Sequence, residues 1–143
     1  MTTRIQLPKV APEAFKALMA LETYMTTTPL QKTHKELIKI RASQINGCAF
    51  CINMHTTDAR KQGETESRIF LLNAWRDSDL YSEEERAILA FTEEVTLIGN
   101  HVSDATYQKM TEHFDNEYIA TVLMMAITIN AWNRMAIATG LRA

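Results

Sequence analysis

The chain has 143 residues, a length that suits one domain with one sizeable hydrophobic core. Apolar residues make up 46% and charged residues 22%, which excludes a largely disordered chain. The formal net charge of −2 leaves no basic surplus, so neither a nucleic-acid-binding protein nor a basic amphipathic membrane anchor is expected.

Helix signals recur along the whole chain, whereas strand signals are nearly absent. There are only four glycines and three prolines, and helical patterns flank the Asn46-Gly47 pair on both sides. Apolar spacing and end signals predict about seven helices, at roughly 13–25, 31–45, 48–62, 66–75, 82–98, 103–114 and 116–139. We therefore predict one all-α domain over residues 1–143, with an antiparallel helix hairpin around Asn46-Gly47.

The last predicted helix is apolar on most of its faces between Ile119 and Ile137. A helix of a small soluble monomer normally keeps one polar side. We therefore expect this helix to form a subunit interface as well as part of the core. The alternative is a central core helix that its own neighbours shield.

The sequence predicts a cytoplasmic protein without a membrane segment. The start of the chain is broken by Pro8 and Pro12 and lacks the long apolar stretch of a secretory signal. The longest apolar run, at about 119–129, is too short to span a bilayer. In a reducing compartment, a close cysteine pair more often serves redox or metal chemistry than a structural disulfide.

The chain's two cysteines and a histidine fall on one helix at informative spacings. Cys48 and Cys51 are three residues apart, and His55 follows Cys51 by four. At about 100° per residue the three side chains share one stripe, and the cysteines lie in the first turn. Unpaired N–H groups there and a neighbouring histidine both lower a thiol pKa, and the thiolate is the reactive form. We predict a redox-active dithiol.

Glu36 supplies a candidate partner for the histidine. It lies twelve residues before Cys48, on the helix that precedes the predicted hairpin. An antiparallel hairpin would bring this carboxylate close to His55. A carboxylate there would hold the imidazole in one tautomer and raise its basicity. The predicted relay runs from Glu36 through His55 to a cysteine.

These four residues also match a known family. The segment from Glu36 to His55, together with Asp58 to Gly63 and Asn130 to Arg134, resembles the AhpD-like alkylhydroperoxidases of the carboxymuconolactone decarboxylase superfamily. The resemblance implies an all-α fold assembled as trimers or hexamers. It also implies reduction of a hydroperoxide by a cysteine pair, with no separate redox cofactor and no metal.

The resemblance assigns a role to each site residue. Cys51 would be the peroxidatic thiol, Cys48 the resolving thiol, and His55 with Glu36 the proton relay. Helix-dipole reasoning alone favours the earlier cysteine as nucleophile; we follow the resemblance because His55 stands one turn beyond Cys51. The implied reductant is a dithiol, either a lipoylated protein or a thioredoxin-like donor. The best-known members carry a histidine where this chain has Phe50, so the resemblance fixes neither peroxidase rate nor reductant.

Other functions fit the same residues. One is a general dithiol–disulfide oxidoreductase with little peroxidase activity. Another is a non-catalytic zinc-binding or assembly module in which Glu36 and His55 complete a site with both cysteines. The cysteines could also be buried small hydrophobes, although four reactive residues at matching spacings weaken that interpretation. The other histidines, His34, His101 and His113, are expected to be surface or capping residues.

Overall fold

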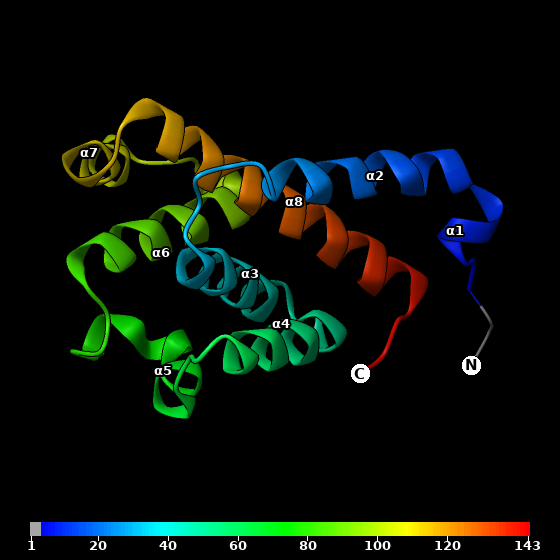
Figure 1. Ribbon diagram of the computed structural model, residues 1–143, viewed down its shortest axis with the longest axis horizontal. Coiled ribbons are helices and arrows are strands. Elements are labelled where there is room, and N and C mark those ends of the chain that lie inside the picture. The colour runs from blue at the N-terminus through cyan, green and yellow to red at the C-terminus, as the bar shows by residue number, and fades with distance from the viewer. Residues whose placement is uncertain (1–3) are drawn as a thin grey trace.

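The computed structural model describes residues 4–143, which form ten helical segments and no β-strand. Residues 1–3 of the predicted domain lie outside the described residues. The all-α prediction is confirmed (Figure 1). The segments are α1 (Leu7–Val10), α2 (Pro12–Met25), α3 (Lys32–Asn46), α4 (Ala49–Lys61), α5 (Glu66–Phe70), η1 (Leu72–Asp77), α6 (Glu83–Thr96), η2 (Ile98–Asn100), α7 (Asp104–His113) and α8 (Asn116–Thr139), where η marks a 3₁₀ helix.

The helix ends follow the sequence signals. The hydroxyl of Ser82 accepts from the Glu85 N–H at 3.2 Å while the Glu85 carboxylate accepts from the Ser82 N–H at 2.9 Å, so the capping box that starts α6 is present. Gly140 ends α8 in the left-handed conformation, at φ 75°. These local interactions explain why the predicted and observed helices differ by few residues.

Two regions differ from the seven-helix prediction. The short helix α1 precedes α2, with a proline in its first turn, where no helix was expected. The helix expected between Thr65 and about Trp75 is divided into α5 and η1. The division is at Leu71 (φ −90°, ψ 0°), and η1 itself leaves helical geometry at Ala74 (φ −119°, ψ 27°), directly after Asn73, a residue type that favours local turns over helix interiors.

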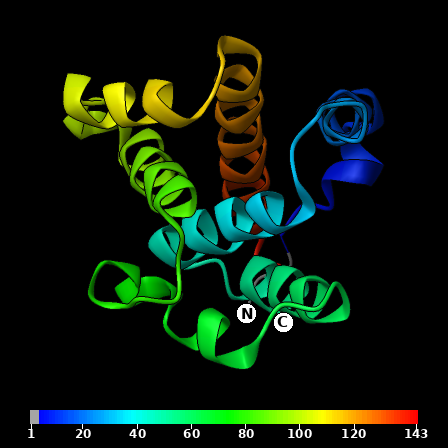
Figure 2. The same ribbon diagram turned by 60° about the vertical axis from the view of Figure 1, so that its left-hand side comes forward.

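Helix α3 is the central element that positions the candidate site. It packs against α4, α6 and α8. Figure 2 shows α3 crossing the middle of the molecule, with α8 on one side of it and α4 on the other. Residues from opposite faces of α3 are therefore buried, including the charged Glu36 and Lys39. A polar group on α3 must find its partner on a neighbouring helix.

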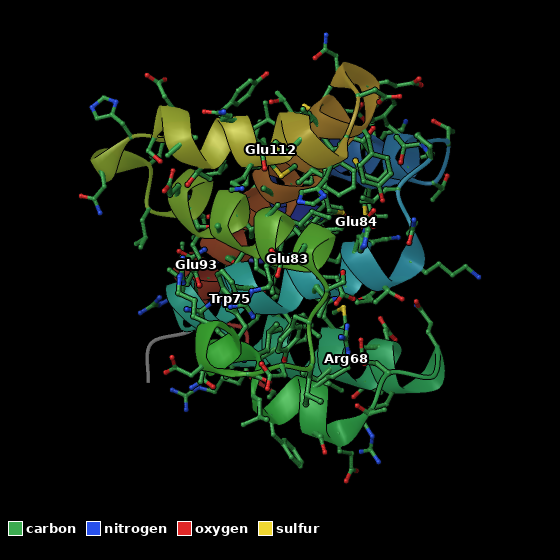
Figure 3. All side chains as sticks on the ribbon, turned by 90° about the vertical axis from the view of Figure 1, so that its left-hand side faces the viewer. Arg68, Trp75, Glu83, Glu84, Glu93 and Glu112 are labelled. Carbon is green, nitrogen blue, oxygen red and sulfur yellow. A yellow bond between two sulfur atoms is a disulfide. The ribbon has the colours of Figure 1, made fainter. Side chains whose placement is uncertain are left out.

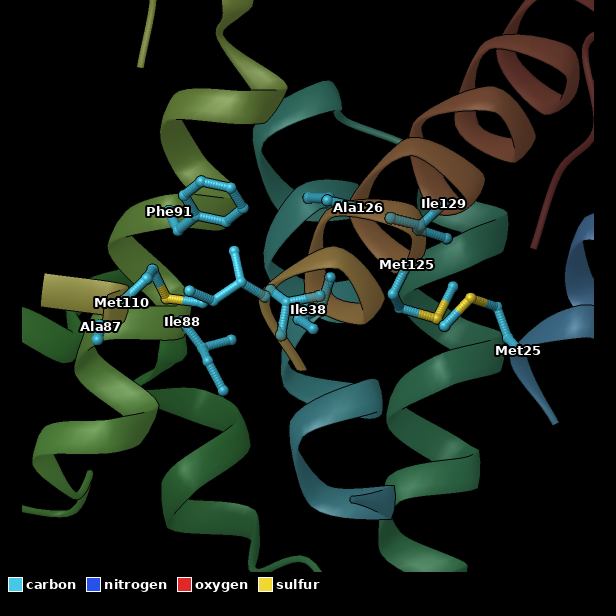
Figure 4. Packing of buried hydrophobic residues seen from close by; sticks show 12 residues of the cluster. Met25, Ile38, Ala87, Ile88, Phe91, Met110, Met125, Ala126 and Ile129 are labelled. Atoms are coloured by element: carbon cyan, nitrogen blue, oxygen red, sulfur yellow. The ribbon is translucent and has the colours of Figure 1, made fainter. Parts of the chain in front are cut away.

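The main core lies between α3, α6 and α8. Figure 4 shows Ile38 in the middle of this cluster, with Ile88 of α6 on one side and Met125 of α8 on the other. All three side chains are fully buried. Burial of each is worth about 2 kcal/mol relative to exposure. This core holds α8 against α3, and α4 packs against both of these helices.

A charged cluster ties η1 to α3 and α6 beside this core. The Glu93 carboxylate accepts from the indole N–H of Trp75 at 2.8 Å, from Arg41 at 2.8 Å and from Arg76 at 2.5 Å. Figure 3 shows Glu93 and Trp75 next to each other on the same side of the molecule. Burial raises the pKa of the Glu93 carboxyl, but these three donors outweigh it and hold the pKa below its usual range.

Helix α8 is buried on one side and apolar on its other side as well. Ile127 is 41% exposed and Ile137 is 45% exposed. A groove of about 620 Å³ lies between α6, η2, α7 and α8. Its lining residues are Phe91, Val95, Ile98, Val102, Tyr107, Leu123, Ile127, Asn130, Ala131 and Arg134. Within residues 4–143, none of the helices combines the length and apolar content needed to cross a membrane.

Candidate active site

The two cysteines lie at the start of α4 and are joined by a disulfide bond. Cys48 is the residue that caps the helix, and its sulfur accepts the backbone N–H of Cys51 at 3.3 Å. Cys48 is 2% exposed and Cys51 is 4% exposed, and both pack against Ala136 of α8, with Phe50 at the edge. The sulfurs therefore sit at a helix N-terminus, where backbone N–H groups stabilise a thiolate in the reduced protein.

The tight connection between α3 and α4 follows from the sequence around Gly47. Gly47 has φ 69°, which a residue with a side chain adopts only with strain. Its N–H donates to Gln44, and the N–H of Cys48 donates to the carbonyl of Ser43 at 3.0 Å, which closes α3. The chain reverses within these few residues, so α4 returns alongside α3. The predicted hairpin is confirmed.

Glu36 and His55 face each other across this hairpin. Oε2 of Glu36 lies 3.5 Å from Nδ1 of His55. Glu36 is 5% exposed and His55 is 9% exposed, and neither of these two atoms has a hydrogen-bond partner among the described residues. A buried polar pair without other partners is costly unless the two groups share a proton or an ordered water molecule.

The structure thus joins the four predicted site residues in two pairs, Cys48 with Cys51 and Glu36 with His55, at one helix hairpin. Cys51 and His55 are buried on α4, Cys48 is buried at its N-cap, and Glu36 of α3 contacts His55. The helical-stripe argument correctly predicted that the three α4 residues share the buried side of one helix. Their chemical roles stay predictions at this point, because geometry alone does not distinguish the attacking sulfur from the resolving one.

The zinc alternative requires both cysteines as thiolates, with Glu36 and His55 as the further ligands. Among residues 4–143, no group of three or more histidine, cysteine, aspartate or glutamate side chains is arranged to hold a metal ion. In the structure the two sulfurs are bonded to each other as a disulfide. A tetrahedral zinc site requires four ligands that converge on one centre.

Sequence reasoning missed a partly buried charge pair between α2 and α3. Lys39 is 4% exposed and donates to Glu22 of α2 at 2.6 Å, and the indole N–H of Trp132 donates to the same carboxylate at 3.2 Å. Burial raises the pKa of Glu22, but the hydrogen bond and charge of Lys39 outweigh it, so the pKa lies below its ordinary value. A lysine one turn after Glu36, on a helix buried on several sides, was the available signal.

A set of polar residues between α3 and α8 was also missed. Asn130 and Asn133 of α8 are buried and contact polar side chains at the end of α3. The resemblance includes the Asn130 to Arg134 segment but predicts no partner for either asparagine. The signal was the presence of two asparagines in an otherwise apolar helix, since buried amides require matching partners on a neighbouring element.

One histidine prediction was wrong. His34 was expected at the surface or in a cap, but it is 4% exposed and lies 2.7 Å from the hydroxyl of Tyr118 on α8. Burial lowers the pKa of its imidazole, against the opposing charge of nearby Glu85. A hydrogen-bonded neutral histidine is tolerated in a core, and this one belongs to the packing of α3 against α8 rather than to the cysteine site.

Comparison with known proteins identifies the family. Residues 12–94 match the model of the carboxymuconolactone decarboxylase family. The chain belongs to this family. A Bacillus subtilis relative, the uncharacterized protein YdfG, is 48% identical over all of this chain and 98% of its own length. The matched segment contains both cysteines, Glu36 and His55.

Solved structures share the fold. ATU0492 from Agrobacterium tumefaciens, a protein of unknown function proposed to be the antioxidant defence protein AhpD, superposes with a TM-score of 0.95 at 42% identity, covering 99% of this chain and 97% of its own. The debrominase Bmp8, solved as a cysteine-to-alanine variant in complex with 2,3,4-tribromopyrrole, has a TM-score of 0.82 at 18% identity, covering 91% of this chain and 70% of its own. At that identity the likeness to Bmp8 concerns the fold alone. The present chain has the AhpD-like fold, and its cysteine pair is consistent with a peroxidase-like activity.

Proposed function

We propose that this protein is a thiol-dependent hydroperoxide reductase. The observation that carries the proposal is the isolated, buried contact between Glu36 and His55 across the hairpin whose second helix begins with the cysteine pair. A structural disulfide needs no such acid–base pair, whereas thiol chemistry does. The carboxylate orients His55, and His55, one turn beyond Cys51, accepts the thiol proton.

The first half of the proposed cycle takes place at Cys51. Its thiolate attacks the terminal oxygen of ROOH, the O–O bond breaks, and the alkoxide leaves as ROH after taking the proton held by His55. Cys51 becomes a sulfenic acid. The sulfur loses two electrons, and the peroxide gains them.

The second half regenerates the dithiol. The Cys48 sulfur attacks the Cys51 sulfenic acid and forms the disulfide. The hydroxide that is released takes the Cys48 proton and leaves as water. A donor dithiol then reduces the disulfide through a mixed disulfide and is itself oxidised. Because Cys48 and Cys51 are only 2% and 4% exposed, a slender dithiol such as a protein-bound lipoyl group fits better than the face of a thioredoxin-like protein.

The same burial bears on the competing function, a general dithiol–disulfide oxidoreductase. Such an enzyme must align its attacking sulfur with a disulfide of another protein, which favours an exposed nucleophile. A hydroperoxide is small enough to reach a recessed sulfur. Burial of Cys51 therefore favours the peroxidase over the general oxidoreductase.

The proposal also covers the cellular compartment and the oligomeric state of the protein. We place the cycle in the cytoplasm, where dithiol donors are kept reduced. We further propose that a second copy of this chain covers the groove beside α8, within a homo-oligomer such as a trimer or hexamer. The apolar groove lining and the exposed Ile127 support this assembly, because large continuous apolar patches are uncommon on monomers.

The function is tested by single-turnover consumption of an alkyl hydroperoxide by the reduced protein, freed of reductant. The wild-type protein should consume one equivalent and end as the Cys48–Cys51 disulfide. Cys51→Ser should consume none above the buffer rate, whereas Cys48→Ser should still consume one. Unchanged consumption by Cys51→Ser would refute the role given to this residue. Rapid oxidation by small disulfides without a preference for peroxide would support the oxidoreductase instead.

A further inference from the structure

Four polar side chains are joined below the turn that presents Cys48. Nδ2 of Asn46 donates to Oδ1 of Asn130 and to Oδ1 of Asn133, both at 2.9 Å. Nδ2 of Asn133 donates to the hydroxyl of Ser43 at 3.0 Å. Ser43 and Asn133 are fully buried, and Asn130 is 9% exposed. We call Ser43, Asn46, Asn130 and Asn133 the asparagine cluster.

The cluster is attached to the cysteine turn at two points. Asn46 is the last residue of α3 and is separated from Cys48 only by Gly47. Ser43, which accepts from Asn133 through its side chain, also accepts the N–H of Cys48 through its carbonyl at 3.0 Å. The backbone around Cys48 is therefore tied to α8 through directional hydrogen bonds.

The same part of α8 contacts the sulfurs. Ala136 stands one turn beyond Asn133 and packs against both cysteines. Apolar packing alone permits small shifts between two helices. Buried amide hydrogen bonds instead fix the register of the helices, because a buried amide that loses its partner is not compensated for its desolvation. α8 is thus fixed against the turn at the point where it touches the disulfide.

From this geometry we infer that the asparagine cluster is a positioning device for the redox pair. Asn46 and Asn133 act through the α3–α4 turn and hold the Cys48 sulfur in reach of Cys51, so that the cluster sets how readily the disulfide closes. This inference rests on the proposed redox role of the cysteines, but not on peroxide as the oxidant. Loosening the turn lowers the effective concentration of one sulfur at the other, and the disulfide then forms less completely.

The test is the equilibrium of the cysteine pair with dithiothreitol. As the Cys48–Cys51 bond forms, the two thiols give up two electrons and two protons, and the disulfide of oxidised dithiothreitol breaks and takes them. Asn46→Ala and Asn133→Ala should each lower the constant for disulfide formation about tenfold, which corresponds to about 30 mV for a two-electron couple. Asn46 is half-buried, so Asn46→Ala is the milder change if Asn133→Ala does not fold.

Two control variants separate positioning from general loss of stability. Thr92→Val removes a fully buried hydroxyl that has no partner among the described residues, and Met125→Ala opens a cavity in the main core. Both should keep the constant within about twofold of wild type, although Met125→Ala should lower the free energy of unfolding. An unchanged constant in folded Asn46→Ala and Asn133→Ala would overturn the inference, as would an equal change in Met125→Ala. Because the measurement uses no peroxide, absence of peroxidase activity would refute the proposed function and leave this result standing.

Discussion

Nδ1 of His55 lies 3.5 Å from Oε2 of Glu36, and both atoms are buried without another partner among the described residues. A carboxylate in this place favours the tautomer that carries its proton on Nδ1. The other ring nitrogen, Nε2, is then free to accept a proton from a thiol. In the proposed cycle the pair would store the Cys51 proton and return it to the leaving alkoxide, so that the reaction would need no proton from bulk water.

Removing the carboxylate should slow the peroxide reaction. We expect Glu36→Gln to lower the second-order rate constant of the reduced protein with hydroperoxide by roughly 10- to 100-fold, because the imidazole loses its orienting charge. Stopped-flow measurement across pH would give the rate and its pH profile. Glu66→Gln is the matched control, because Glu66 forms an exposed ion pair with Arg60, and it should react at the wild-type rate.

The relay also predicts how two changes combine. If Glu36 acts through His55, adding Glu36→Gln to His55→Ala should slow the reaction little beyond His55→Ala alone. Fully multiplicative losses in the double variant would show that the two residues act independently. That result would contradict the relay while leaving the cysteine roles open.

The charged cluster around Glu93 predicts a pH-dependent contribution to stability. Glu93→Gln should lower the unfolding free energy at pH 7 by about 2 kcal/mol, because hydrogen bonds from Trp75, Arg41 and Arg76 lose their charged acceptor. The pKa of this carboxyl is lowered in the folded protein. Its contribution is therefore complete above the unfolded pKa of about 4.3 and is lost as the pH falls through the folded value.

Urea unfolding at several pH values measures this effect. The difference between wild type and Glu93→Gln should shrink below about pH 4.3 and disappear at still lower pH. Glu84→Gln, on the exposed side of the same helix, should stay within about 0.5 kcal/mol of wild type. A difference between wild type and Glu93→Gln that grows on acidification would have the wrong sign for this account.

The groove beside α8 predicts a change in assembly. Light scattering should give a multiple of the 16.3 kDa chain mass for the wild type. Ile127→Glu places a charge in the groove and should shift the protein toward the monomer, because a buried unpaired charge opposes association. Leu80→Glu is the matched control, since Leu80 is 43% exposed but lies outside the groove lining, and it should keep the wild-type mass. A monomeric wild type would contradict the interface.

The sequence predicted the helices well because their ends are set by local chemistry. The Ser82–Glu85 capping box and the glycines at 47 and 140 each act within a few residues. The Glu36–His55 contact was also within reach, because it depends on a short turn between two helices. The asparagine cluster was not, since the partners of Asn46 lie 84 and 87 residues away. The burial of His34 and Lys39 likewise depends on how distant helices pack around α3.

The central claim, that Cys51 is the sulfur that attacks the peroxide, is tested most directly by trapping its sulfenic acid. Reduced Cys48→Ser protein should be mixed with one equivalent of alkyl hydroperoxide in the presence of dimedone, and the modified residue located by mass spectrometry. The account predicts a dimedone adduct on Cys51 in Cys48→Ser, and none on Cys48 when Cys51→Ser is treated in the same way. An adduct on Cys48 in Cys51→Ser, with Cys51 unmodified in Cys48→Ser, would contradict it.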